Sequence, residues 1–301
     1  MSGSVRETFN ETMYDVIKED KDAILIVSDI SHGRLKYIWS EYPNQYYNVG
    51  ICENTCINMA TGLSALGFHP IVHTFSSFII DRSYEQLKLG FGYQKLGGTI
   101  LGIGGAFDYP MHGCTHHSYG DYALIKTIDG SQMFFVASQL EFDVLFKQVY
   151  KNNQLNVFRL ASVNHHADFK KEDIIPGKGI LIKEGKDITI IATGDSLDVA
   201  MEAIKDVSAD MVYIHTIKPL DKALIRKSVS KTGRCIVIDK HSIYGSVYDD
   251  ILRCTTDIQC KFDAITLGDK FTHKYGTYED HCEEMGFTSN NLKKRINNLI
   301  I

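Results

Sequence analysis

The sequence predicts an α/β protein built on two open, doubly wound sheets. Short apolar runs rich in valine and isoleucine alternate along the chain with segments of helical periodicity, which is typical of parallel strands joined by crossover helices. The alternation is interrupted at 163–179, a polar and charged stretch that contains Pro176 and two glycines. Such an interruption is typical of a linker, so two domains are expected, 1–175 and 176–301.

Hydrophobic periodicity places the elements of both domains. Between residues 5 and 16, apolar side chains recur at three- and four-residue steps, which predicts a helix with one buried stripe. Buried strands are predicted in the first domain at 23–29, 46–51, 69–75, 98–104, 133–137 and 155–160. Helices are expected between most of them, notably at 53–66, 82–96 and 139–152. In the second domain, strands are expected at 188–194, 211–217, 234–240 and 262–268.

Composition and charge restrict the expected partners and location. The chain is 44% hydrophobic and 23% charged, as in globular proteins, and its net charge of -5 gives no reason to expect nucleic acid as a partner. No apolar run approaches the roughly 20 residues of a membrane-spanning helix. Segment 1–20 lacks the apolar core of a signal peptide. The seven cysteines are odd in number and scattered, which favours reduced thiols and a cytoplasmic location.

Segment 51–88 contains the strongest candidate for chemistry. Glu53 follows a predicted strand and is expected in the first turn of a helix that is otherwise small and apolar. Such a helix is normally buried, and a buried carboxyl needs a partner. Burial favours its protonated form, whereas the positive end of the helix dipole favours the ionised form. Glu53 is therefore a candidate for sharing a proton near neutral pH, although an acidic helix start can also serve the dipole alone.

The residues after this carboxyl carry a resemblance to a known family. A strand leads to T-F-x-x-F at 74–78 and then to R-x-Y-E-Q at 82–86. In this order the motifs resemble the transketolase family, with its thiamine-diphosphate pyrimidine-binding domain followed by its C-terminal domain. The spacing is especially like that of C-terminal subunits of split transketolases. G-C-T-H-H at 113–117 is similar to the family's G-P-T-H-Q loop, and K-P-L-D at 218–221 is similar to its I-K-P-L-D turn.

The resemblance implies thiamine diphosphate as the cofactor. In the family, a protonated glutamate at the position of Glu53 hydrogen-bonds the aminopyrimidine ring and favours its imino tautomer, which removes the proton from the thiazolium carbon. Phe75 and Phe78 would supply flat apolar faces against the pyrimidine. Asp29 matches an acidic residue that the family places close to the cofactor. Plain core packing is the alternative for both phenylalanines.

The same resemblance implies a group of residues that face the substrate. His116 would lie near the reacting carbons and hydrogen-bond a sugar oxygen or move a proton, with His112 and His117 beside it on the loop. Arg159, at the end of a predicted strand, would suit a phosphate or carboxylate of the substrate. The alternatives are a solvated histidine-rich loop and, for Arg159, a structural ion pair.

The family's signature for the diphosphate and its metal is missing from this sequence. The signature is G-D-G followed by N-N, whereas Gly-Asp occurs here at 120–121, 194–195 and 268–269 and is never followed by glycine. The diphosphate needs a divalent cation held by oxygen ligands, so Mg²⁺ and its ligands are expected on a partner chain, an N-terminal transketolase subunit. The active site would then form at the interface of a heterotetramer with two copies of each chain.

The substrate pocket also departs from the family pattern. His112 stands where the family has an acidic residue, Cys114 replaces a proline, and an upstream histidine falls at or near Gly104. These changes favour a modified sugar or a dedicated biosynthetic substrate over the usual sugar phosphates. The predicted function is transfer of a ketol unit from a ketose to an aldose, by a chain that is active only with its partner.

Three other interpretations stay open. The chain could be half of a deoxyxylulose-phosphate synthase or a beta-type chain of a 2-oxoacid dehydrogenase, although the loop at 113–117 and the T-F-x-x-F spacing favour transketolase over the oxoacid enzymes. It could be a non-catalytic protein that kept the fold. A metal-binding scaffold would use the histidines and cysteines of the loop together with Cys52 and Cys56, but these spacings fit no standard zinc pattern.

Overall fold

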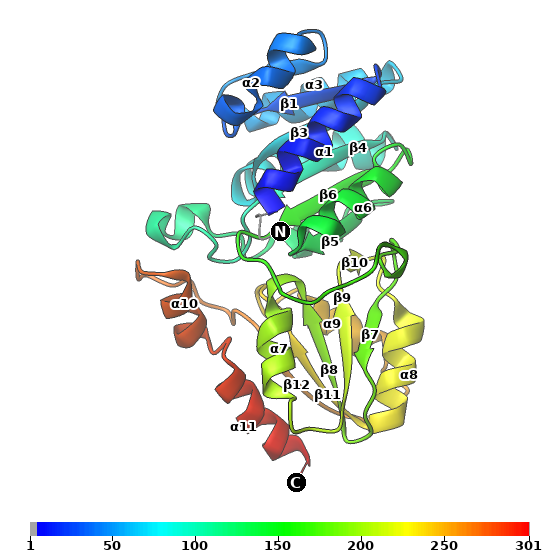
Figure 1. Ribbon diagram of the computed structural model, residues 1–301, viewed down its shortest axis with the longest axis vertical. Coiled ribbons are helices and arrows are strands. Elements are labelled where there is room, and N and C mark those ends of the chain that lie inside the picture. Colours follow the sequence, from blue (N-terminus) through cyan, green and yellow to red (C-terminus); the bar gives the residue numbers. More distant parts are fainter. Residues whose placement is uncertain (1–4, 301) are drawn as a thin grey trace.

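The structure is a computed structural model that describes residues 5–300, apart from the side chains of residues 6 and 7. It contains two sheets, each with helices on both faces (Figure 1). From edge to edge, the larger sheet consists of β10 (Thr216–Lys218), β5 (Gln132–Val136), β6 (Leu155–Leu160), β4 (Gly98–Ile103), β3 (His69–Phe75), β1 (Ala23–Val27) and β2 (Tyr46–Asn48). Its strand pairs are parallel except for β10 with β5.

The smaller sheet belongs entirely to the second half of the chain. From edge to edge, its strands are β12 (Lys261–Ile265), β11 (Arg234–Ile238), β8 (Ile188–Thr193), β9 (Ala209–Ile214) and β7 (Ile180–Lys183), with β7 antiparallel to β9. The helices of this half are α7 (Leu197–Ala203), α8 (Lys222–Thr232), α9 (Val247–Cys254), α10 (Tyr278–Met285) and α11 (Ser289–Ile300). Figure 1 shows α10 close to a loop that projects from the larger sheet.

Most of the predicted elements are present. The strands predicted at 69–75 and 155–160 coincide with β3 and β6, and the other predicted strands of the first domain differ from the structure only at their ends. The short antiparallel edge strand β7 was not predicted, and β10 was not separated from the strand predicted at 211–217. The helices of the first half that have regular geometry are α1 (Val5–Glu19), α2 (His32–Glu41), α3 (Glu53–Ala65), α5 (Asp121–Ile125) and α6 (Gln139–Val149).

The strand predicted at 211–217 is divided between the two sheets. β9 ends in the smaller sheet, and the chain continues as β10 in the larger one. There the carbonyl of His215 accepts a hydrogen bond from the backbone N–H of Phe135 (2.8 Å). Nζ of Lys218 donates to the carbonyl of Ile128 (2.7 Å). The second half of the chain therefore completes the sheet of the first.

The helix predicted at 82–96 is irregular. In its place are a π-helical segment η1 (Ser77–Arg82), a short helix α4 (Tyr84–Gln86) and a second π-helical segment η2 (Leu87–Tyr93). Gly90 packs directly on α3, where an added Cβ would lie 2.4 Å from Cγ2 of Thr61. π-Helical turns are rare and are frequent at functional sites. The first of these segments ends at Arg82, close to the start of α3.

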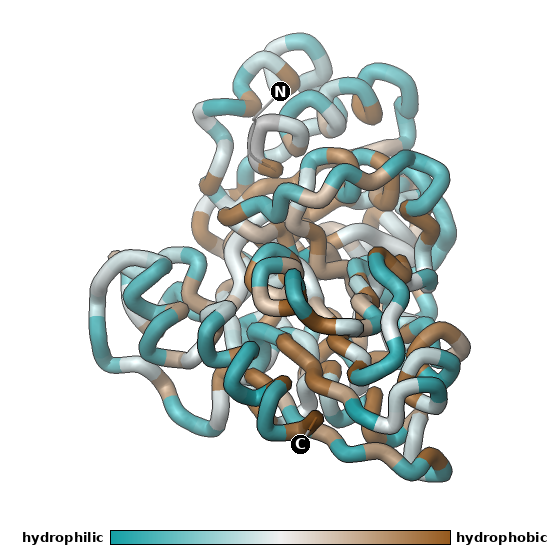
Figure 2. The backbone as a smooth tube through the Cα atoms, turned by 60° about the horizontal axis from the view of Figure 1, so that its bottom comes forward, coloured by the Kyte–Doolittle hydropathy of each residue, from teal (hydrophilic) through white to brown (hydrophobic). Residues whose placement is uncertain are grey.

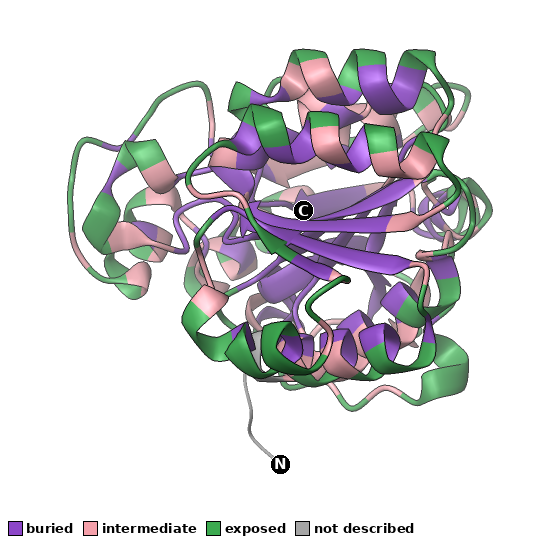
Figure 3. Cartoon of the chain, turned by 90° about the horizontal axis from the view of Figure 1, so that it is seen from above, coloured by how far each residue is buried: buried purple, intermediate pink, exposed green. Residues whose placement is uncertain are grey.

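Two hydrophobic cores flank the larger sheet. On one face, α1 and α6 cover the strands, and Phe9, Phe142 and Phe158 are fully buried there. On the other face, α3 and η2 contribute Ile57 and Phe91 to the second core. The strands are apolar and buried, whereas the outer sides of the helices are largely polar and exposed (Figures 2 and 3). None of the helices within residues 5–300 is long and apolar enough to cross a membrane.

Candidate functional site

The carboxyl edge of the larger sheet carries the candidate site. β1, β3, β4 and β6 are parallel, so their carboxyl ends lie along one edge, where open α/β sheets bind ligands. Phe75 ends β3, Asp29 follows β1, and the long loop 104–120 follows β4. Glu53 joins them because β2, the neighbour of β1, leads into α3.

Glu53 lies where the sequence places it, at the buried start of a helix. It is the first residue of α3, and 4% of its surface is exposed. The preceding turn is fixed by Ser28 at the end of β1. The Oγ of Ser28 donates to the carbonyl of Gly50 (2.8 Å) and accepts from the backbone N–H of Cys52 (3.2 Å). The carboxyl is therefore held at the edge of the sheet by hydrogen bonds between β1 and the turn.

The carboxylate of Glu53 is not free in this structure. Its Oε1 accepts a hydrogen bond from Nη1 of Arg82 (3.2 Å), and the two side chains form an ion pair. The guanidinium of Arg82 also stacks on Phe78, with Cζ 3.8 Å from the ring centroid. The resemblance implied a carboxyl available to a cofactor, whereas in this structure Arg82 occupies one of its oxygens. Sequence reasoning missed Arg82 as a site residue, although its place in the R-x-Y-E-Q motif was the signal.

Phe75, Phe78 and His116 form one cluster. The ring centroids are 5.4 Å apart for the two phenylalanines, and His116 lies 5.0 Å from Phe75 and 4.8 Å from Phe78. All three side chains are half-buried, so the phenylalanines keep part of their flat faces accessible. Tyr109 stacks edge-on against Phe75 (5.0 Å), and His112 stacks on His116 (4.6 Å). The structure thus brings together residues that the sequence analysis assigned to the cofactor and to the substrate.

His116 is held in this cluster by its loop. Nδ1 of His116 lies 3.0 Å from Oγ1 of Thr115, and the carbonyl of Thr115 accepts a hydrogen bond from Oγ of Ser77 in η1 (3.3 Å). Burial lowers the pKa of His116, and the nearby His112 and Arg82 lower it further. The imidazole is therefore neutral near pH 7 and can accept or donate a hydrogen bond.

His117 is enclosed on the other side of the same loop. Its buried ring stacks on Tyr119 and meets His281 of α10 edge-on, with centroids 5.6 Å apart. Burial, followed by the influence of His281, lowers the pKa of His117 to about 4. Nε2 of His117 has no hydrogen-bond partner among the described residues. The sequence assigned His117 to the substrate face, whereas in this structure its ring packs against the second domain.

Arg159 is fully buried at the boundary between the two domains. Nη1 lies 3.4 Å from the carboxylate of Asp121, and Nη2 donates to the carbonyls of Ser118 (3.3 Å) and Lys240 (3.1 Å). Burial raises the pKa of Asp121, but the charge of Arg159 and the hydrogen bond from His241 outweigh it and hold this pKa at about 2. A side chain without exposed surface cannot contact substrate in this structure. In this structure Arg159 forms the structural ion pair that the sequence left open as its alternative role.

Asp29 lies on the same sheet edge but outside the aromatic cluster. It is exposed and adopts a left-handed backbone conformation, with φ of 64°. The backbone N–H of Asp29 donates a hydrogen bond to Oδ1 of Asn48 (3.1 Å). A place near the cofactor is thus still a proposal for Asp29, supported by its position at the end of β1.

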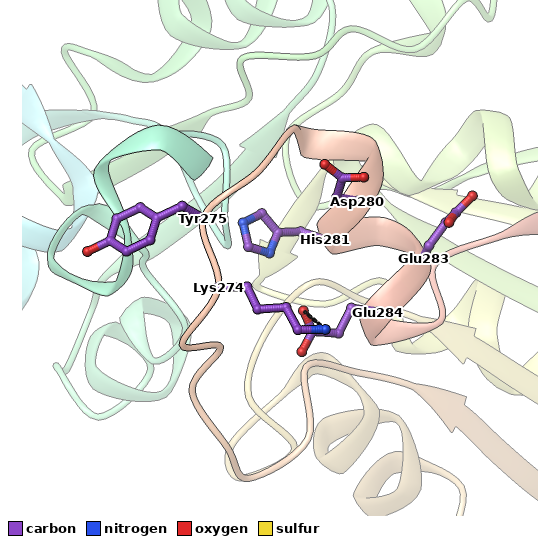
Figure 4. A pocket seen from close by; sticks show the side chains of 6 residues that line it. All are labelled: Lys274, Tyr275, Asp280, His281, Glu283 and Glu284. Carbon is purple, nitrogen blue, oxygen red and sulfur yellow. Dashed lines mark ion pairs between the residues drawn. The ribbon is translucent and has the colours of Figure 1, made fainter.

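The second domain supports the loop 104–120 from outside. Phe271 stacks on Tyr119, with ring centroids 5.7 Å apart, and Tyr275 packs over Gly113, where an added Cβ would lie 2.9 Å from the tyrosine ring. Figure 4 shows Tyr275 directed toward this loop. A cavity of about 370 Å³ lies beside the contact. It is lined by Lys274, Tyr275, Asp280, His281, Glu283 and Glu284.

The alternative metal site does not form in the part of the chain that the structure describes. Within residues 5–300, no group of three or more histidine, cysteine, aspartate or glutamate side chains is arranged to hold a metal ion. In the loop 104–120, His112 and His116 stack on each other, whereas His117 packs against His281. The three histidines therefore do not converge on one point.

Comparison with known families identifies the class of protein. Residues 2–164 match the family described as transketolase, pyrimidine binding domain, and residues 177–292 match the one described as transketolase, C-terminal domain. The chain therefore belongs to the transketolase family. Thiamine diphosphate is the cofactor that this family implies.

Two curated relatives are similar over most of their length. An apulose-4-phosphate transketolase subunit of Phocaeicola vulgatus is 28% identical over 250 residues, which are 80% of this chain and 80% of the relative. The 6-deoxy-6-sulfo-D-fructose transketolase subunit SqwH of Clostridium sp. (strain MSTE9) is 24% identical over 259 residues, 83% of this chain and 80% of the relative.

Longer relatives and a solved structure share the same architecture. The 1-deoxy-D-xylulose-5-phosphate synthase of Halothermothrix orenii is 30% identical over 261 residues, 82% of this chain but only 40% of that enzyme. The chain thus spans less than half of the synthase. A solved structure described as a split gene transketolase, inactive beta4 tetramer, superposes with a TM-score of 0.88 over 99% of both chains at 23% identity. At this identity, the likeness concerns the fold.

Proposed function

We propose that this chain is the C-terminal subunit of a two-chain, thiamine-diphosphate-dependent transketolase that transfers a ketol unit from a ketose to an aldose. The observation that carries the proposal is the convergence of Glu53, Phe75, Phe78 and His116 at the carboxyl edge of one sheet. The chain also matches 80% of the length of two transketolase subunits, which supports its assignment as a subunit of this kind.

The residues present fit the ring system of thiamine diphosphate. Two half-buried phenylalanines offer flat faces to a heterocycle. Glu53 can hydrogen-bond a ring nitrogen once Arg82 has left its carboxylate, since the ion pair joins a nearly buried acid to a side chain that is 48% exposed. When bound, thiamine diphosphate supplies the nucleophilic carbon that breaks and re-forms the carbon–carbon bond of the sugar. Glu53 and the phenylalanines orient the rings for it and exclude water.

His116 is the group of this chain that we assign to the sugar. Its imidazole stands against both phenylalanines and is neutral near pH 7 because burial lowers its pKa. A neutral imidazole can hydrogen-bond a hydroxyl or carry a proton to and from a sugar oxygen. His112, which is exposed and stacked on His116, extends this surface toward the substrate.

The substrate we propose is a modified sugar or sugar phosphate rather than a standard one. Gly104 stands at or near the place of a family histidine, and the ring of Tyr109 fills the space that a side chain at 104 would need. The names of the relatives from Phocaeicola vulgatus and Clostridium specify apulose 4-phosphate and 6-deoxy-6-sulfo-D-fructose. Both are unusual sugars, which supports the proposed class.

The partner we propose is an N-terminal subunit that holds the diphosphate and Mg²⁺ of the cofactor, in a cytoplasmic heterotetramer with two copies of each chain. One side of α3 supports an interface. The small, apolar residues of this helix predict burial over most of its surface, but Asn54, Asn58 and Gly62 are exposed. Nothing lies within 4 Å of a Cβ built on Gly62. Small residues on an exposed helix face allow close approach of another chain.

A deoxyxylulose-phosphate synthase half is the second candidate function, favoured by the 30% identity to that enzyme.

Co-purification with a candidate partner tests the proposal. The partner is a chain that carries G-D-G followed by N-N, co-expressed with this one, and turnover is measured with thiamine diphosphate, Mg²⁺ and a panel of ketose donors and aldose acceptors. We expect cofactor-dependent ketol transfer by the pair and none by either chain alone. Turnover with pyruvate as the donor would point instead to the synthase. A pair that associates but ignores the cofactor would contradict the proposal.

A further inference from the structure

Arg82 occupies the centre of the candidate site without a role in the proposed reaction. Its guanidinium makes two contacts at once, a hydrogen bond from Nη1 to Oε1 of Glu53 (3.2 Å) and a stacking contact with Cζ 3.8 Å from the centroid of Phe78. These are the two side chains that the proposed function assigns to the pyrimidine ring of the cofactor. Arg82 and the ring therefore compete for the same partners.

The guanidinium imitates the contacts of a bound heterocycle. It is flat, it carries N–H groups in its plane, and it stacks on aromatic faces while it donates to carboxylates. An aminopyrimidine stacked on Phe78 and bonded to Glu53 would be flat in the same way. In the free chain, Arg82 therefore contacts the two side chains, Glu53 and Phe78, that are proposed to bind the cofactor.

We propose that Arg82 is a positioning residue that closes the pyrimidine site in the free chain and leaves it when the cofactor and the partner subunit assemble. This inference rests on the proposed function. Arg82 acts through Glu53: while the ion pair persists, the guanidinium occupies the carboxylate that would otherwise meet a ring nitrogen.

The contacts of Arg82 allow its side chain to move alone. The side chain of Arg82 is 48% exposed, whereas that of Glu53 is 5% exposed. Its backbone is held separately, because Nδ2 of Asn54 donates to the carbonyl of Arg82 (3.2 Å) and to Oε1 of Gln86 (2.9 Å). Ion pairs with an exposed partner are weak. The guanidinium can therefore swing into solvent while η1 and α3 keep their places.

Calorimetric titration of the isolated full-length chain with thiamine tests the inference. Thiamine lacks the diphosphate, so it reports only on the groups that meet the rings. We expect Arg82→Ala to bind thiamine about tenfold more tightly than the unchanged chain, which corresponds to about 1.4 kcal/mol. Arg82→Lys, which keeps the charge but not the flat stacking group, should bind with intermediate affinity. The matched control is Arg226→Ala, which removes a half-exposed arginine paired with Asp257 in the second domain and should bind like the unchanged chain.

The double variant of Glu53→Gln and Arg82→Ala gives the second readout. Because Arg82 acts through its pair with Glu53, replacing Arg82 by alanine in the Glu53→Gln chain should change thiamine affinity much less than it does in the unchanged chain. Thermal unfolding of each variant checks that it is folded.

Equal or weaker binding by Arg82→Ala would overturn the inference, and so would the absence of binding in every variant, since an opened site should bind. Failure of the proposed function is recognised separately. If the two-chain enzyme performs thiamine-diphosphate-dependent ketol transfer while Arg82→Ala binds thiamine no better, only the closing role falls. If the pair shows no such turnover, the proposed function itself falls.

Discussion

Gly104 makes room for the ring of Tyr109. A Cβ atom on Gly104 would lie 2.3 Å from Cε2 of that ring, and the backbone at this position has φ of +76°, which side-chain-bearing residues rarely adopt. The ring that fills this space packs edge-on against Phe75, at 5.0 Å between centroids. Gly104 therefore determines, through Tyr109, how one face of the candidate cofactor site is supported.

Gly104→Ala should displace Tyr109 and loosen Phe75. We expect a loss of about 1–3 kcal/mol in the free energy of unfolding, because the methyl group overpacks the site and strains the backbone. Ketol transfer by the assembled pair should fall roughly tenfold or more, since small misplacements in an active site are costly. Urea denaturation and steady-state kinetics measure the two effects. Gly120→Ala, in the same loop but with open space around its Cβ and negative φ, is the control. Equal behaviour of the two variants would refute the role given to Gly104.

Glu53→Gln should remove turnover without unfolding the chain. Glutamine keeps the shape of glutamate but cannot share a proton, and loss of a positioned acid–base group lowers rates by about 100-fold or more. The free energy of unfolding should change by less than about 1 kcal/mol, because the ion pair that is lost has a half-exposed partner. Kinetics of the assembled pair and thermal unfolding are the measurements. Glu202→Gln, which removes an exposed carboxylate of α7, should remain active. Substantial activity of Glu53→Gln would remove the catalytic assignment.

Arg159→Met should act on stability, not on substrate affinity. The substitution leaves the carboxylate of Asp121 buried without its arginine partner, which costs about 3–5 kcal/mol. Asp121→Asn in the same background should recover part of the loss, because the unpaired charge is gone. Urea denaturation measures both variants. An unchanged unfolding free energy together with a raised KM for the sugar would restore the substrate role that the sequence suggested for Arg159.

His117 should make the chain sensitive to acid. Its pKa is about 4 in the folded chain, against a usual value of 6.5, because the ring is buried and lies beside His281. Between these values the unfolded chain binds more protons than the folded one, so stability falls as the pH is lowered from about 6.5 to about 4. Between pH 7 and pH 5, the free energy of unfolding should fall by roughly 2 kcal/mol less in His117→Gln than in the unchanged chain. Unfolding midpoints at pH 7 and pH 5 test it, with the exposed His273→Gln as the control. Identical pH dependence of all three chains would contradict the assignment.

The regular parts of the fold were accessible from local pattern. Strands such as 69–75 and 155–160 are short, continuous apolar runs between helical segments, and both faces of the sheet are covered, so the pattern and the burial agree. Glu53 could be placed at a helix start for the same reason. The order of motifs along the chain was enough to assign Phe75, Phe78 and His116 to one site.

The remaining features depend on contacts between distant residues. Arg159 is buried against Lys240 and His117 against His281, and both of these contacts come from the second domain. The second π-helical segment lies where Gly90 packs on Thr61 of α3, a contact between residues far apart in the sequence. The antiparallel pairing of β7 and β10 at the edges of two different sheets also depends on strands far away in the sequence. Local pattern contains none of this information, so the sequence could not show that Arg159 and His117 are enclosed by the second domain.

The position of β10 limits how the chain can be divided in the laboratory. A fragment that stops at residue 175 would lack Thr216–Lys218 and would present the unpaired backbone groups of β5 to solvent. An open, flat strand edge invites pairing with other molecules. Truncation at the linker should therefore yield a fragment that self-associates. Biophysical work on the first half needs either the intact polypeptide or a grafted strand in place of Thr216–Lys218.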